Sequence, residues 1–182
     1  MSEKTFGCRF ALSIMSDRFI DIILGSLAKT DTSRIEASTG RLSTLYRGDR
    51  EQVLDAVEGC FTHAFTEGVH MTMEATFSTD DGACRTGEAG LPNIAARDIH
   101  FPCNAKMALY TMKADPAEAT RFARDCAVKH GVFVKDDYYC TVLSGDIQDV
   151  FRTTEEICAY AERALDRFAF ELTVSVNSPT AE

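Results

Sequence analysis

The chain repeats itself at a fixed spacing, and this feature constrains its fold more than any other. Gly48 is followed by Asp and a helix-like run, and the same pattern returns at Gly145, an offset of 145 − 48 = 97 residues. When that offset is kept without a gap, residues 8–78 align with residues 105–175, and 12 of these 71 positions are identical. A register that persists over the length of a small domain predicts one fold present twice.

The repeat divides the 182 residues into a first repeat at 1–79, an inter-repeat segment at 80–103 and a second repeat at 104–182. Units of about 80 residues bury a smaller fraction of their surface than larger domains do and are marginally stable alone. We therefore expect the repeats to pack on each other and on a second identical chain. The inter-repeat segment is rich in Gly and polar residues, which fits either a linker or a functional loop.

Hydrophobic periodicity predicts the same order of elements in both repeats, with period two for strands and three- to four-residue steps for helices. The predicted elements of the first repeat are a strand at 8–15, a helix at 16–30, strands at 34–38 and 41–47, a helix capped by Asp49 and a strand at 69–78. The second repeat has predicted strands at 105–112, 131–136, 138–144 and 167–176, and helices that begin at Asp115 and Asp146. This βαββαβ order predicts an α+β fold of two tandem ferredoxin-like repeats packed together.

The composition argues against nucleic acid or anionic lipid as a partner. The formal net charge is −9, and the sequence contains no cluster of Lys and Arg. A neutral or cationic small molecule suits this charge better. The N-terminus lacks the apolar core of a signal peptide, and no stretch approaches the roughly 18 apolar residues of a membrane span. We therefore expect a cytoplasmic protein without membrane insertion.

The sequence contains no recognisable catalytic or metal-binding motif. Its seven cysteines form no CxxC pair, and its four histidines show no HxxxH or HExxH spacing, so we expect no metal site. It has no phosphate-binding glycine loop and no Ser/His/Asp spacing, so we expect no catalytic residues and no cofactor. Cys60, Cys126 and Cys158 fall among apolar residues of predicted helices, which favours buried thiols over nucleophiles.

A ferredoxin-like sheet carries its helices on one face, so strand residues that alternate with the core residues point to the open face. The candidate ligand-binding residues on that face are Ser13, Glu74 and Thr76 in the first repeat and Tyr110, Glu171 and Thr173 in the second. Two interpretations remain. Arg9 with Glu74, and Lys106 with Glu171, would form cross-strand ion pairs that only stabilise the sheet. Alternatively, the two open faces pack into a partly dry cleft that binds a small ligand.

Two other segments are weaker candidates. The run Asp31-Thr32-Ser33 could contact a ligand, but a local turn made by its side chains is favoured. Tyr138 and Tyr139 could stack on an aromatic ring, although one of two adjacent residues in a strand normally faces the core.

Several segments, taken in order, resemble the YkoF-type thiamin/hydroxymethylpyrimidine-binding family. They are "CRFALSIM", "KTDTSRI", "LSTLYRG", "HMTMEATFS", "ALYTM", "GDIQDVF" and "NSPT". The resemblance covers roughly residues 8–78 and 103–180. It implies tandem ferredoxin-like repeats, a homodimer, a thiamin-type site associated with each repeat, and no catalysis.

The resemblance also implies roles for the candidate residues. Glu74 and Glu171 would accept hydrogen bonds from the aminopyrimidine or offset the thiazolium charge, hydroxyls would orient the ring, and Tyr110 would supply an aromatic wall. The chain departs from the family pattern of Leu-Tyr-Pro-Met in the first strands, with Leu-Ser-Ile-Met at 12–15 and Leu-Tyr-Thr-Met at 109–112. At positions 74 and 171 the family pattern has small polar residues rather than Glu.

The expected function is therefore a non-catalytic cytoplasmic binding protein for thiamin or hydroxymethylpyrimidine, linked to vitamin uptake or salvage. Two alternatives stay open at this point. One is an enzyme on a small pyrimidine or cationic substrate, with a glutamate as general base. The other is an interaction module whose open faces only form the dimer.

Overall fold

The structure is a computed structural model that describes residues 4–82, 84 and 89–180. The first repeat comprises β1 (Lys4–Ile14), α1 (Phe19–Lys29), β2 (Glu36–Thr39), β3 (Thr44–Gly48), α2 (Arg50–Ala64) and β4 (Met71–Asp81). After the short 3-10 helix η1 (Ile94–Asp98), the second comprises β5 (Pro102–Thr111), α3 (Pro116–Lys129), β6 (Phe133–Asp137), β7 (Cys140–Asp146), α4 (Ile147–Ala164) and β8 (Phe168–Val176). The predicted α+β fold of two βαββαβ repeats is confirmed.

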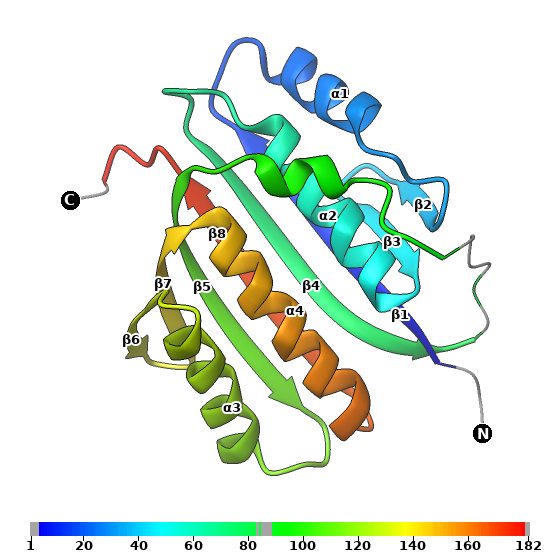
Figure 1. The fold of residues 1–182 in the computed structure, drawn as a ribbon, viewed down its shortest axis with the longest axis vertical. Helices are drawn as coiled ribbons and strands as arrows, with labels where there is room; N and C mark the ends of the chain where they lie inside the picture. Colours follow the sequence, from blue (N-terminus) through cyan, green and yellow to red (C-terminus); the bar gives the residue numbers. More distant parts are fainter. Residues whose placement is uncertain (1–3, 83, 85–88, 181–182) are drawn as a thin grey trace.

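The two repeats share one sheet. Its strand order is β2-β3-β1-β4-β8-β5-β7-β6, and all four α-helices lie on the same face (Figure 1). The junction is the antiparallel pair of β4 and β8, the last strand of each repeat. Each of these strands would be an exposed edge in an isolated repeat, and pairing them satisfies the backbone groups of both edges. The expectation that the two open faces pack against each other is therefore wrong, because they lie side by side on one continuous surface.

The junction has an approximate twofold axis. Ala75 on β4 lies directly opposite Leu172 on β8, and these two positions are equivalent in the repeat, since 172 − 75 = 97. The axis passes between them, perpendicular to the sheet. Any open-face residue near this pair therefore has its counterpart from the other repeat close by.

The hydrophobic core lies between the sheet and the helices and continues across the junction. Phe6, Phe77 and Phe170 are buried on three neighbouring strands, with ring centroids 6.2 Å and 5.9 Å apart along the series. Their burial fixes the helix side of β1, β4 and β8, and the alternation of side chains then directs the polar residues between them to the open face. The cysteines predicted to be buried are buried, at 0%, 3% and 0% exposure for Cys60, Cys126 and Cys158.

The Gly-Asp pairs end one strand and begin the next helix in both repeats, as predicted. Asp146 accepts a hydrogen bond from the backbone N of Gln148 at 2.9 Å and so caps α4. Asp49 holds the same N-cap position before α2, but its side chain makes no capping hydrogen bond. The predicted side-chain cap is therefore present only in the second repeat.

The described part of the inter-repeat segment ties the two repeats together. Asn93 donates from its backbone N and from Nδ2 to Oδ2 of Asp55 on α2, at 3.0 Å and 2.9 Å. Arg97 on η1 lies between two repeat-equivalent glutamates, with Nη2 2.7 Å from Oε1 of Glu155 on α4 and Nε 3.8 Å from Oε2 of Glu58 on α2. The segment thus contacts one central helix of each repeat.

Candidate functional site

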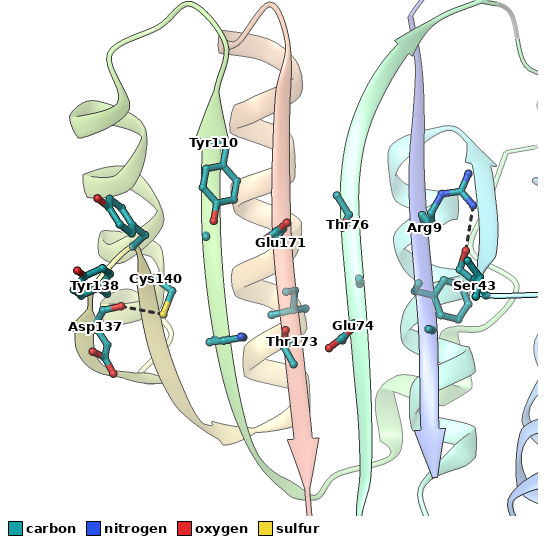
Figure 2. Close-up of a pocket in the computed structure, with 18 residues that line it drawn as sticks. Arg9, Ser43, Glu74, Thr76, Tyr110, Asp137, Tyr138, Cys140, Glu171 and Thr173 are labelled. Carbon is teal, nitrogen blue, oxygen red and sulfur yellow. Dashed lines mark hydrogen bonds between the residues drawn. The ribbon is translucent and has the colours of Figure 1, made fainter.

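A cavity of about 610 Å³ lies on the open face over the junction of the repeats (Figure 2). Residues of β1, β4, β8 and β5 form its floor, and the β2–β3 and β6–β7 turns contribute its two ends. Its volume falls within the range of about 300–1,000 Å³ that is typical of small-molecule sites. The cavity is formed by both repeats together.

Two glutamates and two threonines occupy the centre of this cavity. Glu74 lies opposite Thr173, and Thr76 lies opposite Glu171 (Figure 2). The pair between them on the two strands, Ala75 and Leu172, is buried at 4% and 1% exposure, so the four polar side chains point to the open face. The glutamates are diagonal neighbours, a relationship that places the two Cα atoms about 7–8 Å apart.

The predicted cross-strand ion pairs are not formed. Arg9 lies opposite Thr76, one diagonal step from Glu74, and its Nη1 donates to Oγ of Ser43 at 3.1 Å. Lys106 lies opposite Thr173, again a diagonal step from the glutamate of its repeat. In the described part of the chain, neither Glu74 nor Glu171 has a basic nitrogen within 4.0 Å. Both carboxylates are solvent-exposed and directed at the space a ligand would fill.

Five of the six candidate residues line the cavity. They are Glu74, Thr76, Tyr110, Glu171 and Thr173. Ser13 points to the same open face, but it lies opposite Thr72 near the end of β1 and outside the cavity lining. Its repeat-equivalent Tyr110 carries a longer side chain, which is 43% exposed and lines the cavity.

The sequence analysis did not identify the turns at the two ends of the cavity as parts of one site. Tyr138 and Tyr139 connect β6 to β7 and are 96% and 81% exposed, so the expectation that one of them faces the core is wrong. Both line the cavity, as does Leu42 of the turn in the first repeat. A usable signal existed in the sequence: the offset of 97 residues aligns Tyr139 with Leu42, since 139 − 97 = 42, and each is the second residue of a predicted strand that follows a turn.

The weaker candidate at Asp31 is a local turn, as favoured from the sequence. Oδ1 of Asp31 accepts a hydrogen bond from the backbone N of Ser33 at 2.8 Å, which is an Asx turn. Oδ1 of Asn93 accepts from the backbone N of Asp31 at 2.7 Å. This segment therefore anchors the inter-repeat segment rather than lining the cavity.

Among the described residues, neither the buried thiols nor the potential metal ligands form a second site. Burial raises the pKa of Cys103 and of Cys126 to about 12, which keeps both protonated and poorly nucleophilic at neutral pH. Within residues 4–82, 84 and 89–180, no three or more His, Cys, Asp and Glu side chains gather in a way that could hold a metal ion. In the same residues, no helix has the length and apolar character needed to cross a membrane.

Fold and cavity together define a class: a duplicated ferredoxin-like protein with a carboxylate-lined small-molecule cavity at the junction of its repeats. The model of the YKOF-related family matches the chain in two stretches, at 5–82 and 102–181. The chain is also 33% identical over 187 aligned positions to a Bacillus subtilis (strain 168) protein named "Putative HMP/thiamine-binding protein YkoF", with 98% of this chain and 94% of that protein covered. The chain therefore belongs to the YKOF-related family.

Proposed function

We propose that this protein binds thiamin or its hydroxymethylpyrimidine (HMP) precursor in the open-face cavity, without catalysis. The observation that carries the proposal is the pair of glutamates at the centre of the cavity, Glu74 and Glu171, which have no basic partner among the described residues. The name of the Bacillus subtilis relative supports the same ligand class.

The chemistry of the ligand matches these carboxylates. The exocyclic amine of an aminopyrimidine donates hydrogen bonds, and the thiazolium ring of thiamin carries a positive charge. A carboxylate accepts the former and attracts the latter, and one hydrogen bond to a charged group contributes about 1.5–3 kcal/mol. Thr76 and Thr173 beside the glutamates supply hydroxyls that orient the ring. The net charge of −9 further favours a cationic ligand.

Binding explains the cavity better than catalysis does. A glutamate that acts as general base near neutral pH usually lies buried in a site that excludes water. Glu74 and Glu171 are instead exposed at the floor of an open cavity. We propose that the protein holds its ligand in the cytoplasm for vitamin uptake or salvage and acts as a homodimer.

Isothermal titration calorimetry of the purified chain with thiamin, and separately with HMP, tests the proposal. Saturable binding of at least one of the two is expected. A matched control is the HMP analogue in which hydrogen replaces the amino group, which should bind at least tenfold more weakly because it cannot donate to a carboxylate. Absence of heat and of any thermal shift with both ligands would leave the interaction-module alternative, and turnover of either ligand would establish the enzyme alternative. Sedimentation velocity of the same sample tests the homodimer.

A further inference from the structure

The two ends of the cavity differ chemically, and this difference bears on how the proposed ligand is oriented. At the end formed by the second repeat, the β6–β7 turn presents Tyr138, labelled in Figure 2, and the adjacent Tyr139. At the other end, the β2–β3 turn carries Arg41 and Leu42 at the equivalent positions, since 138 − 97 = 41 and 139 − 97 = 42. The turn at one end is therefore aromatic and the turn at the other is not.

The aromatic turn has an unfavourable backbone. Asp137 pairs with Cys140, which leaves a two-residue hairpin turn, and Tyr138 has a φ of 56°. This left-handed conformation is usual for Gly, Asn or Asp in such turns and is disfavoured for an aromatic residue. Core packing does not compensate for it, because both rings are at least 81% exposed and contact each other edge to face, with centroids 5.2 Å apart. Residues held in such conformations cluster at active sites, ligand-binding sites and switch regions.

The tyrosines adjoin a gap in the sheet. β5 pairs with β7 only from Pro102 to Met107, so the rest of β5 has no neighbour on that side among the described strands. A second cavity of about 280 Å³ opens there, beside α3, and shares Ala108, Tyr110, Tyr138, Tyr139 and Cys140 with the first. Three tyrosine side chains thus line the region where the two cavities meet.

A carboxylate is within reach of the same region. Ala108, two residues before Tyr110 on β5, lies directly opposite Glu171 on β8. Glu171 and Tyr110 are therefore diagonal neighbours on the open face (Figure 2). A ring placed against the tyrosines can direct a donor substituent toward Glu171.

We infer that the second-repeat end binds the planar heteroaromatic ring of the ligand, with Tyr138 and Tyr139 as its stacking wall and Glu171 as its acceptor. This inference rests on the proposed function and adds which repeat holds the ring. The first-repeat end lacks the wall and binds such a ring more weakly.

The test compares variants of the full chain by calorimetry with thiamin and with HMP. Tyr138→Asn removes one ring while retaining a residue that tolerates the left-handed backbone, and Tyr139→Ala removes the other. Leu24→Ala is the control, because it truncates an exposed apolar residue of α1, which lies on the helix face of the sheet and outside the cavity lining. Each tyrosine variant should weaken binding about three- to tenfold, the range expected for loss of an aromatic pair. Leu24→Ala should bind both ligands within about twofold of the unchanged chain.

A second readout locates the ring directly. The chain has no Trp and five Tyr, so its near-ultraviolet emission comes from tyrosine, and ligand binding should quench less of it in the Tyr138→Asn and Tyr139→Ala variants. Equal affinities and equal quenching in all variants would overturn this inference while leaving the proposed function intact. If the unchanged chain bound neither ligand, the proposed function and this inference would fail together. Melting temperatures of the variants identify any loss caused by unfolding.

Discussion

Glu74 on β4 lies directly opposite Thr173 on β8, and the pairing of Thr76 with Glu171 repeats this relationship two residues away. The two glutamates occupy equivalent positions of the two repeats, and so do the two threonines. The second pair is therefore the first pair with the two repeats exchanged. The pairing of β4 with β8 therefore brings the two glutamates, which are 171 − 74 = 97 residues apart in sequence, into one cavity. The predicted role of Glu171 in ligand binding follows from this register.

Replacing Glu171 by Gln should weaken binding of thiamin or HMP by roughly ten- to a hundredfold, because a charge-assisted hydrogen bond is lost while the shape is kept. Calorimetry measures the effect. Glu67→Gln is the control, since Glu67 is exposed on the loop between α2 and β4, outside the cavity lining, and should bind as the unchanged chain does. An unaltered affinity in Glu171→Gln would remove Glu171 from the site.

Stability should fall as the pH rises from about 4.5 to about 7, through the buried carboxyl of Glu58. Burial raises the pKa of Glu58 from 4.5 to about 7, and the nearby Arg97 guanidinium only partly opposes the rise. Between these values the folded chain keeps a proton that the unfolded chain has lost, so this contribution is fully present below pH 4.5 and disappears as the pH passes 7. Over this pH range, the contribution of Glu58 to the free energy of unfolding changes by on the order of 3 kcal/mol.

Urea unfolding of the unchanged chain and of Glu58→Gln, from pH 4.5 to 8, measures this contribution as the difference between the two curves. The comparison isolates Glu58 from the other titrating groups, including its neighbours Asp55 and Glu155, which remain in both proteins. Parallel curves would show that Glu58 has an ordinary pKa in the folded chain.

Asn93→Ala should destabilise the fold by about 2–4 kcal/mol. Asn93 is 5% exposed and makes both of the hydrogen bonds described above to Asp55, which is itself 2% exposed. The variant removes the side-chain donor and leaves the buried carboxylate of Asp55 with one hydrogen bond fewer. An unsatisfied buried charge destabilises the fold by more than the net contribution of the hydrogen bond that was lost. Chemical denaturation measures the loss, and Asn104→Ala, at an exposed position of β5, should stay within about 0.5 kcal/mol of the unchanged chain.

Ligand should protect Cys140 from thiol reagents. Five of the seven cysteines are buried, whereas Cys84 and Cys140 are partly exposed, so these two should react first in the folded protein. Cys140 lines the cavity and Cys84 does not. Mass spectrometry after brief alkylation should therefore show that saturating thiamin or HMP slows modification of Cys140 alone. Equal rates at Cys140 with and without a ligand that binds would place the ligand elsewhere.

Much of the fold could be predicted from local pattern. Alternation assigned Glu74 and Glu171 to the open face, since successive side chains of a strand point to opposite faces. The same rule failed at Tyr138 and Tyr139, because these residues lie in a tight turn where alternation does not apply. Side-chain capping at Asp49 also failed, because a suitable residue type at the N-cap position does not ensure that the side chain makes the hydrogen bond.

The candidate site was predicted residue by residue, but not as one site. Ion pairs from Arg9 and Lys106 were plausible when only neighbouring strands were considered. In the observed register, each basic residue lies diagonally from its glutamate rather than directly opposite it. This register depends on pairing between strands that are distant in sequence. Likewise, the inter-repeat segment gave no sign that Arg97 contacts a helix of each repeat.

The sequence by itself determined the duplication, the order of strands and helices and the polarity of each sheet face, because these depend on local periodicity and on a register counted along the chain. Only the tertiary structure decided that the two half-sheets join through β4 and β8, that Glu74 and Glu171 therefore share a cavity, and that one end of it is aromatic. The physical reason is that the backbone groups of an edge strand can form hydrogen bonds with several other strands. Which strand becomes the partner depends on residues far apart in the chain, and the local sequence does not specify it.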